Sequence, residues 1–436
     1  MSAATRESPF RLESHRFRLL LLTLVALAAV QAFGLADLLG GAVHAVVGSA
    51  LIAATLWVLH PRRPLFWTAL VLALPTIVEV LRSPAGPDVA ELAGSRLQAP
   101  FFCLAAAALS AQVVSSERAD EDTVVGSICA YLFIALAFAS LYTAIAASSP
   151  ESFQLGDLSP GERLFDRLAY LSLVTITTLG YGDIVPVSGL ARSLVSLEAI
   201  TGILFPSIVI ARIVSLYTSG GGRPFAVRAA PQRPGRFELL LATEVVLLLA
   251  TPGPEGSLAA RIALGMLAAL LLLAALHAGS DRTLTRAVGA SLALLSLAAR
   301  WWPGAQPGWR EAALGFETVL LALVASSLFG WLLREQRVTR ELLLAAVALY
   351  GLLGFAWASA FGLLEIHSPG AHTTGDGGAS RSDLVYYSFM TLTTTGFGDI
   401  APISPVAKRL ATFESLIGIL YPSMLVARLV ALYRSD

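Results

Sequence analysis

Charged residues are scarce in this sequence. Asp, Glu, Lys and Arg together make up 14% of its 436 residues, whereas apolar residues make up 56%. The mean hydropathy is +0.72. Soluble domains do not have this balance, so the composition excludes an ordinary soluble enzyme or binding module and indicates a protein that lies in a bilayer.

Several other features are rare or missing. Cys103 and Cys129 are the only cysteines, and because both lie in apolar stretches we expect them to pack as small hydrophobic side chains rather than to form a disulfide.

The formal net charge is zero, which gives no support for a nucleic-acid partner. The sequence contains no catalytic triad, metal-ligand cluster or phosphate-binding loop, so we expect no enzyme, no cofactor and no ligand other than membrane lipid. The basic start and first apolar run lack a small-residue cleavage site, so no secretory signal peptide is expected.

Long apolar runs are abundant, and their length matches the hydrocarbon core of a bilayer. They predict twelve membrane spans, six in each half of the chain. One of these, 237–252, is short and is interrupted by Glu244. The expected spans are 18–38, 41–60, 64–82, 97–116, 123–147, 188–217, 237–252, 257–278, 284–301, 308–333, 340–365 and 405–433.

Basic residues in short loops predict the orientation of these spans, because such residues favour the cytoplasmic side. They precede the first span, follow the second and fill the central linker, which all fall on one side if the spans alternate. We therefore expect a multi-pass protein of the cell (inner) membrane with both termini cytoplasmic. The residues concerned are Arg6, Arg11, Arg16, Arg18, Arg62, Arg63, Arg223, Arg228, Arg233 and Arg236.

A short motif occurs twice. Residues 177–183 read Thr-Thr-Leu-Gly-Tyr-Gly-Asp, and 216 residues later 393–399 read Thr-Thr-Thr-Gly-Phe-Gly-Asp; in both copies the Asp begins an Asp-Ile-x-Pro sequence. Glycines at alternate positions allow left-handed backbone dihedrals, so successive carbonyl groups can point at one axis and replace the water shell of an ion. The preceding threonine can add a further oxygen.

Both copies resemble the pore signature of potassium channels, and the resemblance covers about 123–217 and 339–433. It implies K+ as the permeant ion and a selectivity filter in each copy, supported by residues around it. The implied filter residues are Thr178, Leu179, Gly180, Tyr181 and Gly182 in the first copy and Thr394, Thr395, Gly396, Phe397 and Gly398 in the second. Asp183, Asp399, Glu198 and Glu414 are the candidates for filter support.

The repeat extends beyond the filter. A shift of 216 residues pairs positions after the filter, and a shift of 219 pairs the preceding helix, for example Tyr131 with Tyr350. We therefore expect an all-α membrane protein of two tandem repeats, each with four peripheral helices, an outer helix, a re-entrant pore helix with its filter, and an inner helix. The expected divisions are a first peripheral bundle (1–122), a first pore domain (123–217), a linker (218–236), a second bundle (237–338) and a second pore domain (339–436).

The expected pore helices, about 163–177 and 381–393, would direct their carbonyl ends at the ion path and favour a cation there. Ser172 and Ser388 are expected to bond within these helices. Glu198 and Glu414 lie in apolar surroundings, where a carboxyl is costly. They either brace the filter and tune gating or form a buried polar contact between helices.

Each inner helix carries a glycine and, one turn later, a proline. Gly202 with Pro206 and Gly418 with Pro422 are candidates for a gating hinge, because glycine eases bending and proline removes a helical hydrogen bond. The alternative is that the glycines permit close helix packing. Arg212 and Arg428, nearer the cytoplasmic ends, are expected to snorkel or to pair with acidic linker residues, pointing away from the pore.

Some positions depart from the family pattern or lack an expected feature. Leu179 and Thr395 stand where valine or isoleucine is usual, and Phe397 replaces tyrosine, which puts fine selectivity in question rather than conduction. The Thr395 hydroxyl could bond behind the filter. The fourth span of each repeat lacks a regular arginine series, and Arg334, Arg337 and Arg340 follow the end of one, so we expect no voltage gating by a charged helix.

The resemblance therefore favours a passive potassium channel. A filter of this kind needs four loops, and since the chain supplies two, we expect a homodimer. A potassium-uptake transporter subunit and a nonselective cation channel are the alternatives. Transporters of that type usually keep one glycine per filter and hold four repeats in one chain, unlike this sequence.

Overall fold

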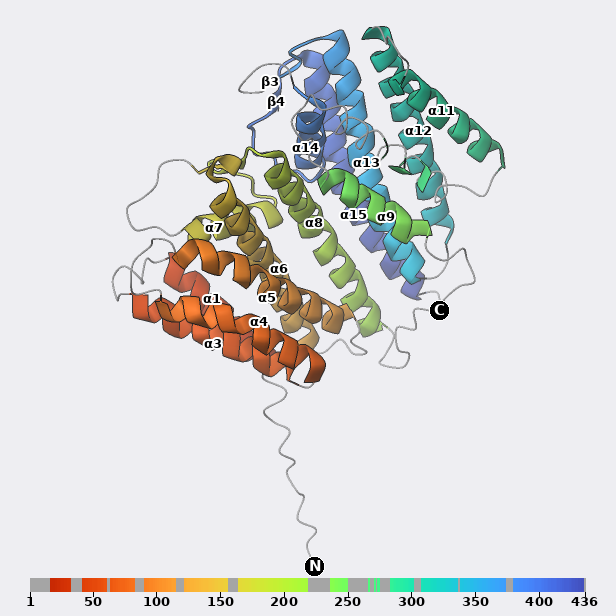
Figure 1. Ribbon diagram of the computed structural model, residues 1–436. Helices are drawn as coiled ribbons and strands as arrows, with labels where there is room; N and C mark the ends of the chain where they lie inside the picture. Colours follow the sequence, from red (N-terminus) through yellow and green to blue (C-terminus); the bar gives the residue numbers. More distant parts are fainter. Residues whose placement is uncertain are drawn as a thin grey trace, which may run out of the picture. The chain divides into compact units, whose positions relative to one another are not determined.

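The computed structural model of the chain (Figure 1) resolves into two compact units, which are described separately. The first comprises Met1–Pro150, Asp157–Leu173 and Arg212–Phe225, and the second comprises Glu151–Gly156, Val174–Ala211 and Ala226–Asp436. The structure describes residues 16–32, 41–60, 63–82, 90–114, 121–155, 164–218, 236–249, a few positions within 266–274, 283–301, 307–335, 338–373 and 379–434.

Five helices make up most of the described part of the first unit. α1 packs on α3, α3 on α4, α4 on α5, α5 on α6, and α6 returns to α1. Phe101, Leu109 and Phe133 are fully buried among them. Thr55, which is fully buried in this apolar bundle, satisfies its hydroxyl within its own helix by donating to the Leu51 carbonyl at 2.7 Å. The helices are α1 (Arg16–Ala32), α3 (Gly41–Leu59), α4 (Arg63–Arg82), α5 (Ala90–Val114) and α6 (Glu121–Ser148).

The second unit is organised around α13, which contacts α9, α12, α14 and α15, while α11 packs on α12. Thr339 caps the start of α13, since its hydroxyl accepts a hydrogen bond from the Leu342 amide at 3.1 Å. The helices are α9 (Arg236–Leu249), α11 (Thr283–Trp301), α12 (Pro307–Arg334), α13 (Arg340–His367), α14 (Arg381–Leu392) and α15 (Pro405–Arg434). The unit also contains most of α8 (Gly189–Thr218) and the last turn of α7 (Leu164–Ile176).

Each repeat contains a two-residue antiparallel ladder that holds the segment after the filter. In the first, β1 (Phe153–Gln154) pairs with β2 (Val185–Pro186); in the second, β3 (His372–Thr373) pairs with β4 (Ala401–Pro402). The next amides follow the same pattern, because Val187 N donates to Ser152 O and Ile403 N to Ala371 O, both at 2.8 Å. These ladders were not predicted from the sequence.

The prediction of an all-α membrane protein is confirmed. Five described helices are long and apolar enough to cross a membrane: Asp122–Ser148, Gly189–Val214, Glu311–Arg334, Arg340–His367 and Pro405–Val430. All but one of the expected spans coincide with a helix, and the exception, 257–278, lies largely outside the described residues. The expected pore helices coincide with α7 and α14. The domain divisions stay a prediction.

Candidate functional site

The two motif segments share an unusual backbone. Thr178, Gly180 and Gly182 have φ of +57°, +58° and +74°, and Thr394, Gly396 and Gly398 have +58°, +57° and +79°. Thr178 and Thr394 are the only non-glycine residues with positive φ in the described part of the chain. A threonine in this region is strained, and such strain marks functional segments. The left-handed dihedrals expected of the glycines are therefore present in both copies.

The amide groups of these segments bond backwards to the ends of the pore helices. Leu179 N and Gly180 N donate to the Val174 carbonyl at 2.9 and 3.3 Å. In the second copy, Thr394 N donates to Thr391 O at 3.0 Å and Gly396 N to Met390 O at 3.1 Å. Because the donors are used behind the loop, its carbonyl oxygens remain available to a cation on the other side.

The two segments lie against each other. A β-carbon on Gly180 would lie 1.5 Å from the Thr395 carbonyl oxygen, and one on Gly182 would lie 2.1 Å from the Phe397 carbonyl oxygen. Glycine is thus required here for close approach as well as for its dihedrals. By contrast, β-carbons on Gly396 and Gly398 would meet no described atom within 4 Å.

The second filter is held from behind by hydroxyl groups. The Thr395 hydroxyl lies 2.9 Å from that of Thr393, and Thr393 Oγ1 donates to Phe389 O at 2.6 Å. Tyr350 of α13 donates to the Leu392 carbonyl at the end of α14, at 3.0 Å. Tyr350 was recognised in the sequence only as a repeat marker, so its bracing role was missed.

The prediction that Ser172 and Ser388 bond within their pore helices is wrong. Ser172 Oγ donates to Ala135 O of α6 at 2.7 Å, and Ser388 Oγ lies 2.8 Å from Gly354 O of α13 and 2.5 Å from Glu414 Oε1 of α15. Small residues let the outer helices approach closely enough for these hydroxyls to leave their own helix. The two serines therefore tie each pore helix to its outer helix.

Glu198 and Glu414 are both fully buried. Through Ser388, Glu414 joins the inner helix α15 to the pore helix α14. This contact is compatible with both alternatives for Glu414, a carboxyl that braces the filter and a buried polar contact between helices. An effect of Glu414 on gating therefore stays a prediction.

Gly202 and Gly418 press the inner helices against the ends of the pore helices. A β-carbon on Gly202 would lie 2.1 Å from Ile176 O, and one on Gly418 would lie 1.8 Å from Leu392 O. Close packing is thus an observed role of both glycines. Pro206 and Pro422 lie inside α8 and α15 as expected, and the hinge remains a prediction.

Asp183 and Asp399 end the two motif segments and lie in different surroundings. Asp183 is exposed and Asp399 is half-buried. Burial raises the pKa of the Asp399 carboxyl, and the Tyr386 hydroxyl and the Arg192 guanidinium oppose that rise. The Arg192 guanidinium of the first repeat thus favours the charged form of a carboxyl in the second.

Arg428 partly meets its expectation. It donates to the Leu333 and Glu335 carbonyls at the end of α12, both at 2.8 Å. It is thus held by the linker between α12 and α13, as proposed, but through backbone oxygens rather than through an acidic side chain. Arg212 is buried.

An ion channel family model matches residues 127–219 and 343–435, the regions of α6–α8 and α13–α15. Protein LctB of Bacillus caldotenax is 30% identical over 124 residues, which cover 25% of this chain and 92% of that protein. Protein LctB of Geobacillus stearothermophilus is 31% identical over 108 residues, covering 24% and 80%.

The chain belongs to this ion channel family. No solved structure matches it significantly. The family match occurs twice in tandem, and each copy of the channel region carries one strained, glycine-bearing loop. The described helices α1, α3, α4, α5, α9, α11 and α12 lie outside the residues that the family model matches.

Proposed function

We propose that this ion channel conducts K+ selectively and passively. The observation that supports this most is the alternation of left-handed residues in both filters, together with amides bonded to the pore helices. This arrangement leaves rows of carbonyl oxygens to replace the hydration shell of K+. We place the protein in the cell (inner) membrane with both termini cytoplasmic, on the distribution of basic loop residues.

A transporter subunit for potassium uptake and a nonselective cation channel remain the competing proposals. Both filters keep the full Gly-aromatic-Gly-Asp sequence, which favours stacked carbonyl rings and a selective channel over either alternative.

Purified protein in liposomes separates these proposals. We expect K+ flux down its gradient to exceed Na+ flux by more than about tenfold, which corresponds to about 1.4 kcal/mol between the two ions. Empty liposomes are the control. Equal K+ and Na+ flux would support the nonselective channel, and K+ uptake that requires a co-transported ion would support the transporter.

We further propose that the working unit is a homodimer. Four loops are needed around one axis, and the second filter has an open side: β-carbons on Gly396 and Gly398 would meet no described atom. The first filter also lacks cover, since Tyr181 is 66% exposed whereas its counterpart Phe397 is 6% exposed. A second copy related by twofold symmetry would place its first filter beside this second filter and cover both.

We expect the open probability to depend only weakly on voltage. Arg334 ends α12 and Arg340 begins α13, so these residues belong to different helices, and Arg340 pairs with Glu238 at 3.4 Å on an exposed surface. Each gating charge that crosses the membrane would contribute about 2.3 kcal/mol per 100 mV. Currents in planar bilayers from the wild type and from the Arg334→Gln, Arg337→Gln, Arg340→Gln variant should have the same shallow slope. A steep slope that this variant abolishes would contradict the proposal.

A further inference from the structure

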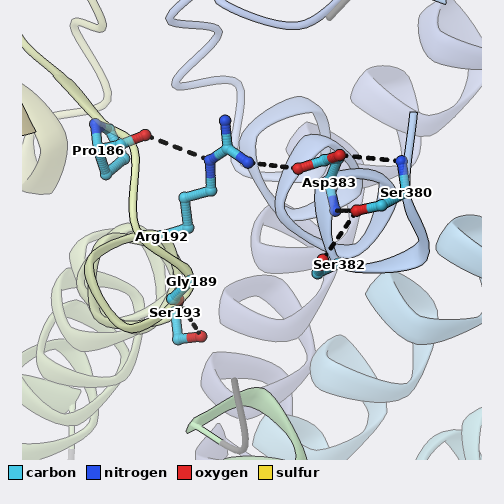
Figure 2. A network of polar contacts seen from close by, with 7 residues as sticks. All are labelled: Pro186, Gly189, Arg192, Ser193, Ser380, Ser382 and Asp383. Carbon is cyan, nitrogen blue, oxygen red and sulfur yellow. Dashed lines mark hydrogen bonds and ion pairs between the residues drawn. The ribbon is translucent and has the colours of Figure 1, made fainter. Parts of the chain in front are cut away.

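Arg192 lies in the first turn of α8 and reaches out of its own repeat. Its Nε donates to the Pro186 carbonyl at 3.2 Å, and its Nη1 forms an ion pair with Asp383 of α14 (Figure 2). Its guanidinium carbon also lies 5.2 Å from the centre of the Tyr386 ring. One side chain thus contacts the segment after the first filter and the pore helix of the second.

Asp383 is fixed in place by its own helix. Its second carboxylate oxygen accepts a hydrogen bond from the Ser380 amide at 2.9 Å, while its own amide donates to the Ser380 hydroxyl at 3.3 Å, forming a capping box (Figure 2). The Arg192 and Asp383 side chains are only 23% and 18% exposed. A pair with both partners held and largely covered differs from a freely solvated surface pair, which contributes little.

The contact joins the two filters mechanically. Pro186 lies in β2, three residues after Asp183, and it is anchored by its pairing with Phe153. α14 carries the second filter at its other end, through the bonds of Gly396 and Thr394 to Met390 and Thr391. Arg192 therefore connects the segment that follows the first filter to α14, the helix that holds the second filter.

The repeat does not preserve this contact. The shift of 216 residues replaces Arg192 by Lys408, Asp383 by Arg167 and Tyr386 by Tyr170. Lysine cannot reproduce the planar fork of arginine, and Arg167 offers it a like charge. Asp166 stands beside Arg167, and both already contact other groups. Lys408 is exposed in the single chain.

We propose that Arg192 is a positioning residue that braces the two filters of one chain, so that braced junctions within chains alternate with unbraced junctions between chains around the pore. The proposal rests on the dimeric channel proposed above. In that ring, Lys408 of one copy faces Arg167 of the other at the position where Arg192 faces Asp383. Around the outer mouth of the pore, two junctions are then held by an ion pair and two are not, so the firmness of the junctions follows the same twofold symmetry as the sequence.

Ion flux tests the function of the brace. Arg192→Gln and Asp383→Asn should each lower the K+ to Na+ flux ratio by about tenfold, and the double variant should lower it no further, because both remove one interaction. Arg192→Lys, which keeps the charge but not the planar fork, should lower the ratio less than Arg192→Gln does. The matched control Lys408→Gln should change it less than twofold. Equal losses from Lys408→Gln and Arg192→Gln, or losses that add together in the double variant, would overturn the proposal.

Cross-linking tests the geometry independently of conduction. In a Cys103→Ala, Cys129→Ala background that carries Arg192→Cys and Asp383→Cys, a bifunctional thiol reagent about as long as an arginine side chain should link the two positions within one chain. Mass spectrometry of the digested protein should find the linked peptide pair, while the protein runs at the size of a single chain on a denaturing gel. A band of two chains, or no cross-link where the protein is natively assembled, would contradict the brace. If the wild-type protein were not selective for K+, the proposed function would be refuted, but the cross-linking test of the contact would still stand.

Discussion

Replacing Gly180 with alanine is expected to abolish K+ flux. Gly180 has φ of +58°, where a β-carbon costs about 1 to 2 kcal/mol. That β-carbon would also lie 1.5 Å from the Thr395 carbonyl oxygen, a backbone atom of the neighbouring filter. One of the two filters must therefore shift, which would misalign the carbonyl rings that replace the ion's water shell. The measurement is K+ flux in liposomes from protein of wild-type size.

Gly396→Ala makes the comparison informative. Gly396 has φ of +57°, but its β-carbon would meet no described atom within 4 Å in the single chain. If a second copy places its first filter there, Gly396→Ala should be as damaging as Gly180→Ala. Gly330→Ala in α12 is the control, since its β-carbon also meets nothing, and it should leave flux unchanged. Wild-type flux from Gly180→Ala would refute the filter assignment. If Gly180→Ala abolishes flux but Gly396→Ala lowers it only mildly, the proposed dimer junction would be refuted.

The filter backbone and the helices were predictable because both depend on local sequence. Alternate glycines predict left-handed dihedrals from sterics alone, and apolar runs of bilayer length predict helices without reference to their neighbours. The pore helices α7 and α14 could be placed in the same way, from their position just before the filters.

The contacts between elements could not be read from the sequence. Ser388 was expected to bond locally, yet its partners Gly354 and Glu414 lie on two other helices. The Arg192 and Asp383 pair joins residues 191 positions apart. The repeat gave no signal for it, since a search for shared positions passes over residues whose counterparts have a different charge.

For the glycines of the inner helices, the sequence could not distinguish between two roles. Both a hinge and a close contact need a residue without a side chain, so Gly202 and Gly418 fit either role. Only the approach of Ile176 O and Leu392 O shows that close contact is one of them.

Assembly is expected to give particles of two chains, each of 45.8 kDa, around one central pore. Two non-identical filters per chain limit the symmetry to twofold, with the two kinds of repeat alternating. Native mass spectrometry in detergent measures the number of chains directly. A conducting monomer, or four chains with every filter around a shared axis, would contradict this assembly.

A linked dimer tests the position of each filter in the ring. Two copies joined end to end by a flexible linker should conduct like the unlinked protein. A single Gly396→Ala change then alters one position in four, and the same change in both halves alters two opposite positions. We expect flux to fall with one change and to vanish with two, because each altered loop disturbs a carbonyl ring that all four loops must complete. Since Gly396 meets an open side in its own chain, the effect of a single change depends on the neighbouring copy. An unaffected linked dimer with both changes would show that the second filter does not line the conducting pore.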